Sequence, residues 1–579
     1  MNRQISKALF LLLLTSLFCL VLFAQGGGQS PPQQAVGRNV EEGIPVSDPL
    51  VISKCSGCHQ QDDKGNLSRI SWERTTPEGW QEVIRRMVRL NGLTLTPEEG
   101  RAIVKSLSSS HGLAPEEAKP VMYMAEHRLI DETYPTPTIR STCASCHPLG
   151  RPMSWRRSRE EWQLLVNMHI AFFPNAEGFA FRRPNRGADP TAAASQPQQQ
   201  PADEAVDYFG RNFGLRTTHW AAWSARMRPP RLAGKWLLTA HRSGHGNYVG
   251  EVVITAGAAE DEFTTRIKLQ PVSGGPPIER TGRVLVYAGY SWRGRSMGTA
   301  PSSAPGEVPS EMYETMWISP DEPVATGRWF WGGYDEFSFD VRLQRASGTP
   351  MLSAVDRPSL QAGLQTQRIR LLGDSLPAQI APSDLAVGSG VTVRRIVSRT
   401  PQDVVAEVDV AANAIPGRRD IALGSFILPN AIAVYDKVDY IKVIPETGVS
   451  RLGGASQHPK GYQQFEVMAY NRGIDNKVST ADDIEIGPVS VAWSVEEFPE
   501  RFDDDDKRFV GALDANGLFT PAPDGPNPER KQSANNYGNV WVVATAQNEK
   551  DRYGKPLVGK SYLVVVPPLF IICDREMAP

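Results

Sequence analysis

Two Cys-x-x-Cys-His motifs, at residues 55–59 and 143–147, constrain this 579-residue chain more than any other feature. The motif is the attachment signature of a c-type haem, in which two thiols add to the haem vinyl groups and the imidazole binds the iron. The alternative, a pair of redox or zinc Cys-x-x-Cys turns, leaves the histidine of each motif unexplained. We therefore predict two covalent haems. The attaching cysteines are Cys55, Cys58, Cys143 and Cys146, and the first iron ligands are His59 and His147.

The N-terminus has the pattern of a secretory signal peptide. Arg3 and Lys7 supply positive charge, residues 8–24 are almost wholly apolar, and glycines at 26–28 end the run. We expect a signal peptide at 1–25 that is cleaved after export, and a flexible lead-in at 26–48. The alternative is an uncleaved anchor, since seventeen apolar residues reach only the lower edge of a membrane span. Because c-type haems are attached outside the cytoplasm, we expect a bacterial periplasmic protein.

The sequence pattern predicts a multidomain chain, α followed by all-β. Residues 49–231 carry a helical pattern and both haem motifs, interrupted at 187–205 by a low-complexity Gln/Pro insertion. From residue 232 onward, apolar and polar residues alternate between glycine turns, which indicates antiparallel strands. We expect an antiparallel β-barrel domain at 232–373, a small β-sandwich domain at 374–428 and an immunoglobulin-like β-sandwich at 429–579.

Some classes of function are disfavoured by composition and motif content. The formal net charge is only −2, so nothing points to a nucleic-acid partner. The strands follow one another at roughly ten-residue spacing without intervening helices, and no phosphate-binding glycine loop is found. Both observations argue against a nucleotide-binding α/β fold.

The two haem motifs belong to a repeated unit. Thr76-Pro77 opens a helix after the first motif, and Ser158 opens another after the second, with Glu161 at capping-box spacing. A tryptophan stands four residues after each cap. Seven residues beyond each tryptophan, on the same helical face, stand Met87 and His169, which can both ligate iron. We predict His59/Met87 for one haem and His147/His169 for the other.

This ligand assignment predicts two haems of different potential. A thioether stabilises ferrous iron and raises the potential, whereas a second imidazole lowers it. Other candidates for the sixth ligands stay open, and the two units can also exchange ligands. The competing side chains are Met122, Met124, Met153, Met168, His111 and His127.

Three other groups of polar residues are expected to be structural or accessory. The candidates for pairing with haem propionates are Arg85, Arg86 and Arg89 beside Met87, and Arg151, Arg156 and Arg157 after the second motif, although solvated helix faces are an equal alternative. His241 and His245 lie in a predicted glycine turn with no third metal ligand nearby. The acidic run at 503–506 is expected to be a solvated loop, with calcium binding as the alternative.

The order of these motifs resembles the α subunit of quinohaemoprotein amine dehydrogenase. The specific elements are Gly234-Lys235-Trp236, the stretch 244–250, and Val286-Tyr287-Ala288-Gly289-Tyr290-Ser291-Trp292-Arg293-Gly294, followed by the immunoglobulin-like tail. The resemblance covers nearly the whole mature chain. It implies a di-haem domain and three β domains, with cysteine tryptophylquinone on a small partner subunit and a β-propeller subunit completing a heterotrimer. Electrons from amine oxidation would pass through the haems to a soluble copper protein or cytochrome c.

The sequence leaves two other functions open. One is a stand-alone di-haem cytochrome c that docks another dehydrogenase, and the other is a di-haem peroxidase, which needs an open or displaceable sixth position. We expect the β domains to be a scaffold, so that a chain ending near Arg231 would still hold both haems.

Overall fold

The computed structural model describes residues 41–121, 136–144, 149–182, 199–300, 303–499, 503–531 and 533–568. The expected signal peptide and most of the Gln/Pro insertion lie outside these residues. So do Cys146 and His147, and the candidate ligands Met122, Met124 and His127. Within the described ranges, no helix has the length and apolarity that a bilayer span requires.

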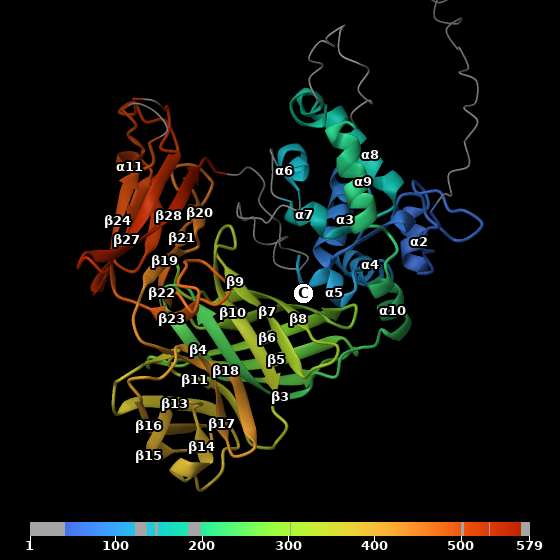
Figure 1. Ribbon diagram of the computed structural model, residues 1–579. Coiled ribbons are helices and arrows are strands. Elements are labelled where there is room, and N and C mark those ends of the chain that lie inside the picture. Colours follow the sequence, from blue (N-terminus) through green and yellow to red (C-terminus); the bar gives the residue numbers. More distant parts are fainter. Residues whose placement is uncertain are drawn as a thin grey trace, which may run out of the picture. The chain divides into compact units, whose positions relative to one another are not determined.

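The first domain is helical, and most of the helices described in it have proline in the first turn. Asp48 caps the helix that ends at Cys55, and Thr136 caps the helix that ends at Cys143. In both cases proline occupies the first turn, where its missing N–H costs nothing. The helices are α2 (Pro49–Cys55), α3 (Pro77–Asn91), α4 (Pro97–Ser110), α5 (Pro115–Ala118), α6 (Pro137–Cys143), α7 (Gly150–Met153), α8 (Arg159–Phe172), α9 (Pro201–Asn212) and α10 (Thr218–Arg226), with a π-helical turn at Glu177–Phe181 (Figure 1).

The second domain is a closed antiparallel barrel in which each strand pairs with its sequence neighbours and the last pairs with the first. Alternating burial along the strands fills its interior with apolar side chains. Closure leaves no unpaired edge. The strands are β3 (Gly234–Arg242), β4 (Gly246–Ala256), β5 (Glu262–Pro271), β6 (Ile278–Tyr287), β7 (Ser291–Gly298), β8 (Glu311–Ile318), β9 (Val324–Trp331) and β10 (Phe337–Arg345) (Figure 1, green).

The third domain is a sandwich of two four-stranded sheets around one apolar core. It begins at Met351, before the boundary at 373 expected from sequence, because Met351–Val355 pairs with Gln367–Asp374 rather than with the barrel. One sheet has the order β11-β13-β16-β15 and the other β12-β18-β17-β14. The strands are β11 (Met351–Val355), β12 (Ser359–Gln361), β13 (Gln367–Asp374), β14 (Leu385–Ala386), β15 (Val391–Arg399), β16 (Asp403–Val410), β17 (Gly417–Leu423) and β18 (Phe426–Tyr435).

The fourth domain is also built from β-sheets around its own core. Trp493 is partly buried and packs against that core, with its ring centroid 6.5 Å from that of Phe465. The strands are β19 (Tyr440–Ile444), β20 (Thr447–Arg451), β21 (Gln463–Gln464), β22 (Glu466–Asn471), β23 (Ile484–Pro488), β24 (Val491–Glu497), β25 (Gly511–Leu513), β26 (Leu518–Pro521), β27 (Gly538–Lys550) and β28 (Pro556–Val566), with the short helix α11 (Asp506–Phe509).

The barrel and the helical domain share a core. Tyr287 belongs to the same buried cluster as Cys55 and Trp80. The hydroxyl of Tyr290 donates to the carbonyl oxygen of Leu113 over 2.9 Å, and Arg293 pairs with Glu78 of α3. The Tyr-x-x-Tyr-x-Trp-Arg stretch is therefore an interdomain joint. A chain ending near Arg231 would lose these contacts, so the expectation of an intact, independent haem domain is not supported by the packing.

Candidate haem-binding site

The repeated unit inferred from sequence has a structural counterpart. Short strands β1 (Glu73–Thr75) and β2 (Trp155–Arg157) immediately precede helices α3 and α8, and they pair antiparallel with each other. Thr76 caps α3 by accepting a hydrogen bond from the amide of Gly79, and Ser158 caps α8 through the amide of Glu161. The two units are therefore joined where their ligand-bearing helices begin.

In the first unit, the motif follows α2 directly. Cys55, the last residue of α2, is buried, whereas Cys58 is exposed and His59 is half-buried. Nδ1 of His59 lies 2.8 Å from the carbonyl oxygen of Ser68. Because a carbonyl can only accept, Nδ1 must carry the proton, and the Nε2 lone pair then faces elsewhere. This is the arrangement that second-shell hydrogen bonds impose on iron-binding histidines.

Met87, the predicted partner of His59, lies on α3 and is half-buried. The side-chain amide of Asn91, one turn further on, donates towards its sulfur over 3.6 Å. Trp80 of the same helix is buried in the core that also holds Cys55. The helix of Met87 and the turn of His59 thus pack on one core, while their binding to a single iron remains a prediction.

In the second unit, the structure brings two predicted residues into one cavity of about 530 Å³. Cys143, from the end of α6, and His169, from α8, both line it. The volume lies within the range of cofactor pockets. The remaining lining is mostly apolar: Thr142, Leu149, Pro152, Trp162, Leu165, Val166, Phe173, Asn175, Ala176, Phe179, Ala180, Phe181, Ala202, Ala205, Val206 and Phe209.

His169 is held in a ligating tautomer. Its Nδ1 donates to the carbonyl oxygen of Leu165 over 2.8 Å, so Nε2 carries the lone pair with which imidazole binds iron. The ring of Phe181 stands edge-on to it at 6.2 Å. Trp162, on the same helical face, stacks on Phe209 with ring centroids 4.8 Å apart. An apolar cavity with an attaching cysteine and a fixed imidazole fits a covalently bound haem.

Among the competing ligands that the structure describes, His111 is engaged elsewhere. It is fully buried, its Nε2 contacts the carbonyl oxygen of Ile44 at 2.9 Å, and its Nδ1 contacts Ser110. Burial lowers the pKa of His111 to about 4, so it stays neutral. Met168 is 38% exposed. Met153 packs against both the barrel core and the core that contains Trp162 and Phe209. Neither methionine lines the cavity of His169.

The surroundings of the thiols disfavour the redox alternative. Burial raises the pKa of Cys55, and the neighbouring Cys58 raises it further. Burial also raises the pKa of Cys143 to about 11. Redox-active cysteines act as thiolates and lie in surroundings that lower the thiol pKa. The surroundings of Cys55 and Cys143 shift the pKa in the opposite direction.

The arginines of β2 are occupied by protein carboxylates. Arg156 lies 3.3 Å from Glu117, and Arg157 donates to Glu73. Arg74 of β1 is also buried and makes two hydrogen bonds to Glu117, of 2.9 and 3.0 Å. Arg156 and Arg157 therefore stabilise the junction of the two units, which is a structural role rather than propionate binding.

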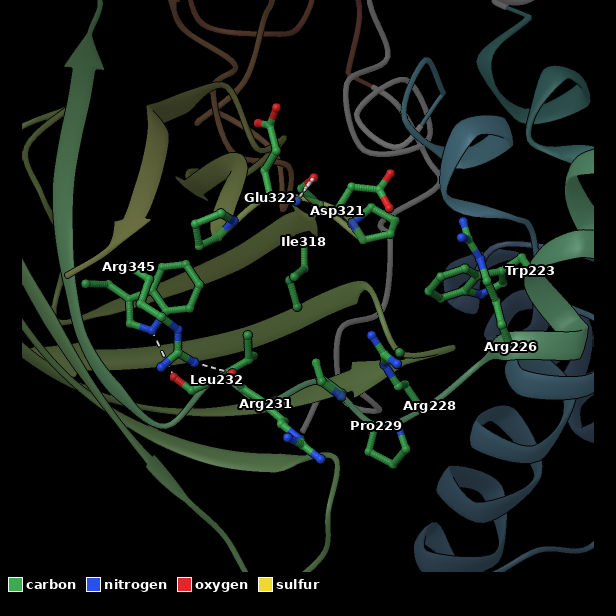
Figure 2. A pocket seen from close by; sticks show the side chains of 16 residues that line it. Trp223, Arg226, Arg228, Pro229, Arg231, Leu232, Ile318, Asp321, Glu322 and Arg345 are labelled. Atoms are coloured by element: carbon green, nitrogen blue, oxygen red, sulfur yellow. Dashed lines mark hydrogen bonds between the residues drawn. The ribbon is translucent and has the colours of Figure 1, made fainter. Parts of the chain in front are cut away.

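A different cavity, of about 450 Å³, lies between the linker after α10 and the β8–β9 turn (Figure 2). Arg226, Arg228 and Arg231 line one side, and Asp321 and Glu322 the other. Its lining contains no cysteine, histidine or methionine, so it offers no iron ligand.

Two other polar groups singled out from sequence are His241 and the acidic run at 503–506. His241 is the penultimate residue of strand β3, not part of a turn, and its Nε2 lies 3.0 Å from Glu466 of the fourth domain. In the acidic run, Asp503 pairs with Lys531 and Asp505 with Arg530. One carboxylate oxygen each of Glu497, Asp504 and Asp506 lie within 4.8 Å of one another, a spacing that could hold a metal ion, so calcium binding stays the alternative to a solvated loop.

One signal was missed in the sequence. Each first cysteine of a motif ends a seven-residue helix, Pro49–Cys55 or Pro137–Cys143, that starts with a capping residue and a proline. Cap-proline pairs at a fixed distance before both cysteines would have extended the repeat upstream. The buried partners Glu73 and Glu117 were also missed, because buried charge pairs leave no periodic pattern.

Together the fold and the site define a haem-binding helical domain joined to a closed barrel and two further β domains. Comparison with protein families agrees, domain by domain. The models of the quinohemoprotein amine dehydrogenase alpha subunit match at residues 46–189 (haem binding), 229–346 (domain II), 349–436 (domain III) and 441–574 (domain IV). The chain belongs to this family: it is a haem-binding alpha subunit of a quinohemoprotein amine dehydrogenase, an amine oxidoreductase.

No curated protein sequence matches the chain. Some solved structures resemble parts of it. A de novo designed fluorescence-activating β-barrel is 20% identical over 20% of this chain and 93% of its own, with a TM-score of 0.16. Human protocadherin-24 EC1-2 is 12% identical over 38% of this chain and 98% of its own, with a TM-score of 0.15. These similarities carry no functional argument.

Proposed function

We propose that this chain is the di-haem electron-transfer subunit of a periplasmic amine dehydrogenase. Electrons from amine oxidation at cysteine tryptophylquinone on a small partner subunit would pass through two c-type haems to a soluble copper protein or cytochrome c. A β-propeller subunit would complete the heterotrimer. The observation that carries the proposal is the cavity that Cys143 and His169 share, in a unit that pairs with a second unit of the same design.

Bound haem would supply a one-electron redox centre at each unit. The chain's own residues set how that centre behaves. His59 and His147 would bind iron on one face, and Met87 and His169 on the other. Trp162 and Phe209 would exclude water from the second site, which keeps its dielectric low. A His/Met site next to a bis-His site gives a relay with two potentials.

The two alternative functions are weaker on this geometry. A peroxidase needs an open or displaceable position on iron, but His169 lines the cavity in a ligating tautomer. A stand-alone carrier would use the β domains to dock another dehydrogenase. Assignment to an alpha subunit instead implies further subunits of the dehydrogenase.

The test is purification from the native host, followed by amine-dependent haem reduction measured by absorbance. Benzylamine or butylamine should reduce the haems, and a small chain with a quinone adduct should co-purify. The control is tert-butylamine, a primary amine that has no hydrogen on the carbon bearing nitrogen. Haem that stays oxidised with benzylamine, with no co-purifying chain, would favour the stand-alone carrier. Peroxide-dependent haem oxidation with turnover would favour the peroxidase.

A further inference from the structure

Two carboxyl groups, Glu73 and Glu161, face each other in the buried region between the two haem units. Glu73 lies on β1 and is 8% exposed, and Glu161 lies in the first turn of α8 and is 5% exposed. The charge of Glu73 acts on the carboxyl group of Glu161, and both residues surround Arg157, which donates to Glu73. Two carboxylates at close range cannot both remain charged without strong compensation.

The nearby arginines compensate the negative charge of Glu161 only in part. Arg157 of β2 donates to Glu73, and Arg69, in the loop before Ile70–Trp72, lies 3.0 Å from Glu161. The Arg69 side chain is 48% exposed, so solvent screens its charge. Arg86 of α3 adds a positive charge near Arg157. Burial first, and the charge of Glu73 second, raise the pKa of Glu161 to about 7.

This carboxyl pair is linked to a wall residue of the second cavity, Trp162, by sequence and through Arg157. Glu161 precedes Trp162, which lines that cavity. The guanidinium of Arg157 stacks 4.2 Å from the ring centre of Trp155 and 5.6 Å from that of Trp162. Charges separated by buried protein interact more strongly than charges in water. A change of charge inside the cavity must therefore change the proton affinity of the pair.

We propose that Glu161, together with Glu73, is a proton-binding site coupled to haem reduction in the cavity of His169. The inference rests on the proposed function, since it requires haem in that cavity. One electron, supplied by amine oxidation, reduces ferric iron to ferrous iron there. One proton from solvent binds a carboxylate oxygen of the pair, forming an O–H bond, so that the charge of the buried region is unchanged. Oxidation by the acceptor reverses both steps.

The sign of the coupling follows from electrostatics. The added electron favours the protonated carboxyl group, so the pKa of the pair is higher in the reduced protein than in the oxidised one. Between these two pKa values the reduction potential falls as pH rises. Full coupling of one proton to one electron changes the redox equilibrium constant tenfold per pH unit, which is about 59 mV.

The test is a redox titration of the full-length haem protein with chemical mediators, repeated over about four pH units centred on neutrality. The wild type should show a pH-dependent potential for one haem. Glu161→Gln, which keeps the shape but not the charge, should remove that dependence. The matched control is Glu160→Gln, the exposed neighbour on the same helix, which should keep the wild-type slope. A full slope in Glu161→Gln, from a group such as a haem propionate, would overturn the proposal.

A second measurement does not depend on the variant folding. Reduced-minus-oxidised infrared spectra of the wild type near neutral pH should show a carboxylic acid C=O band that appears on reduction and shifts in D₂O. Absence of that band would also refute the coupling. Because the reductant is chemical, failure of amine oxidation or of subunit assembly leaves these outcomes unaffected. Haem content, measured first, separates a failure of the haem assignment from a failure of the coupling.

Discussion

Glu117 offers a strong test of how the two haem units are held together, because one carboxylate serves both β1 and β2. It accepts two hydrogen bonds from Arg74, one of 2.7 Å from the Thr217 hydroxyl and one of 2.8 Å from the amide of Ala114. Arg156 adds its charge at 3.3 Å. Both arginine side chains are buried, so Glu117→Gln would leave them without a counter-charge.

The expected loss of unfolding free energy follows from the pKa of Glu117. Burial alone would raise the pKa of Glu117, but the hydrogen bond and charge of Arg74 outweigh it and lower the pKa from 4.5 to about 2. At about 1.36 kcal/mol per pKa unit this corresponds to about 3 kcal/mol. The side chain is only 4% exposed, so solvent screening takes little away. Removing one partner of a buried pair typically costs about 3–5 kcal/mol, which agrees.

The assay is urea unfolding of the haem-loaded protein at neutral pH, followed by haem absorbance so that the signal reports the helical domain. Glu117→Gln should lose about 3 kcal/mol of unfolding free energy, and the control Glu116→Gln, an exposed neighbour, should stay within about 0.5 kcal/mol of wild type. Because the folded pKa is lowered, the stabilisation is present above about pH 4.5 and is lost as pH falls through about 2. A loss below about 1 kcal/mol at neutral pH would refute the reasoning.

Other predictions concern the iron ligands and one interdomain pair. Met87→His should lower the potential of one haem, because imidazole stabilises ferric iron better than thioether does, and should remove the near-infrared band of Met-ligated ferric haem; unchanged potentials would make Met87 a core residue. His169→Ala should leave the second iron able to bind cyanide, seen as a spectral shift that wild type lacks. The hydrogen bond and charge of Glu466 raise the pKa of His241 to about 9, so this pair should stabilise the protein fully below about pH 6.5 and lose its effect as pH rises through about 9. The melting temperature of Glu466→Gln should then converge with that of wild type at high pH. A difference in melting temperature that stays constant with pH would contradict the assignment.

Much of this architecture is readable from sequence because its signals are local. Three signals depend only on residues close in sequence: the Cys-x-x-Cys-His spacing, the caps at Thr76 and Ser158, and the period-two strands after residue 232. The fold class, helical haem domain followed by a barrel and sandwich-like sheets, was predicted correctly for that reason.

Features that depend on distant contacts were not predictable. The third domain starts at Met351 because that strand pairs with β13, and alternation alone cannot tell which sheet a strand joins. Glu161 stands at capping-box spacing from Ser158, yet its carboxyl group turns towards Glu73 and Arg69 instead. The joint through Tyr287, Tyr290 and Arg293 links segments about 200 residues apart, so only the structure shows that the barrel completes the haem domain.

The most direct test of the central claim is the haem content of the intact, denatured chain by mass spectrometry, for wild type and for the double variant Cys143→Ala/Cys146→Ala. Two covalent haems per wild-type chain and one in the variant, with the lower-potential step missing from its redox titration, are the expected results. One haem or none in the wild type, or two in the variant, would contradict the account.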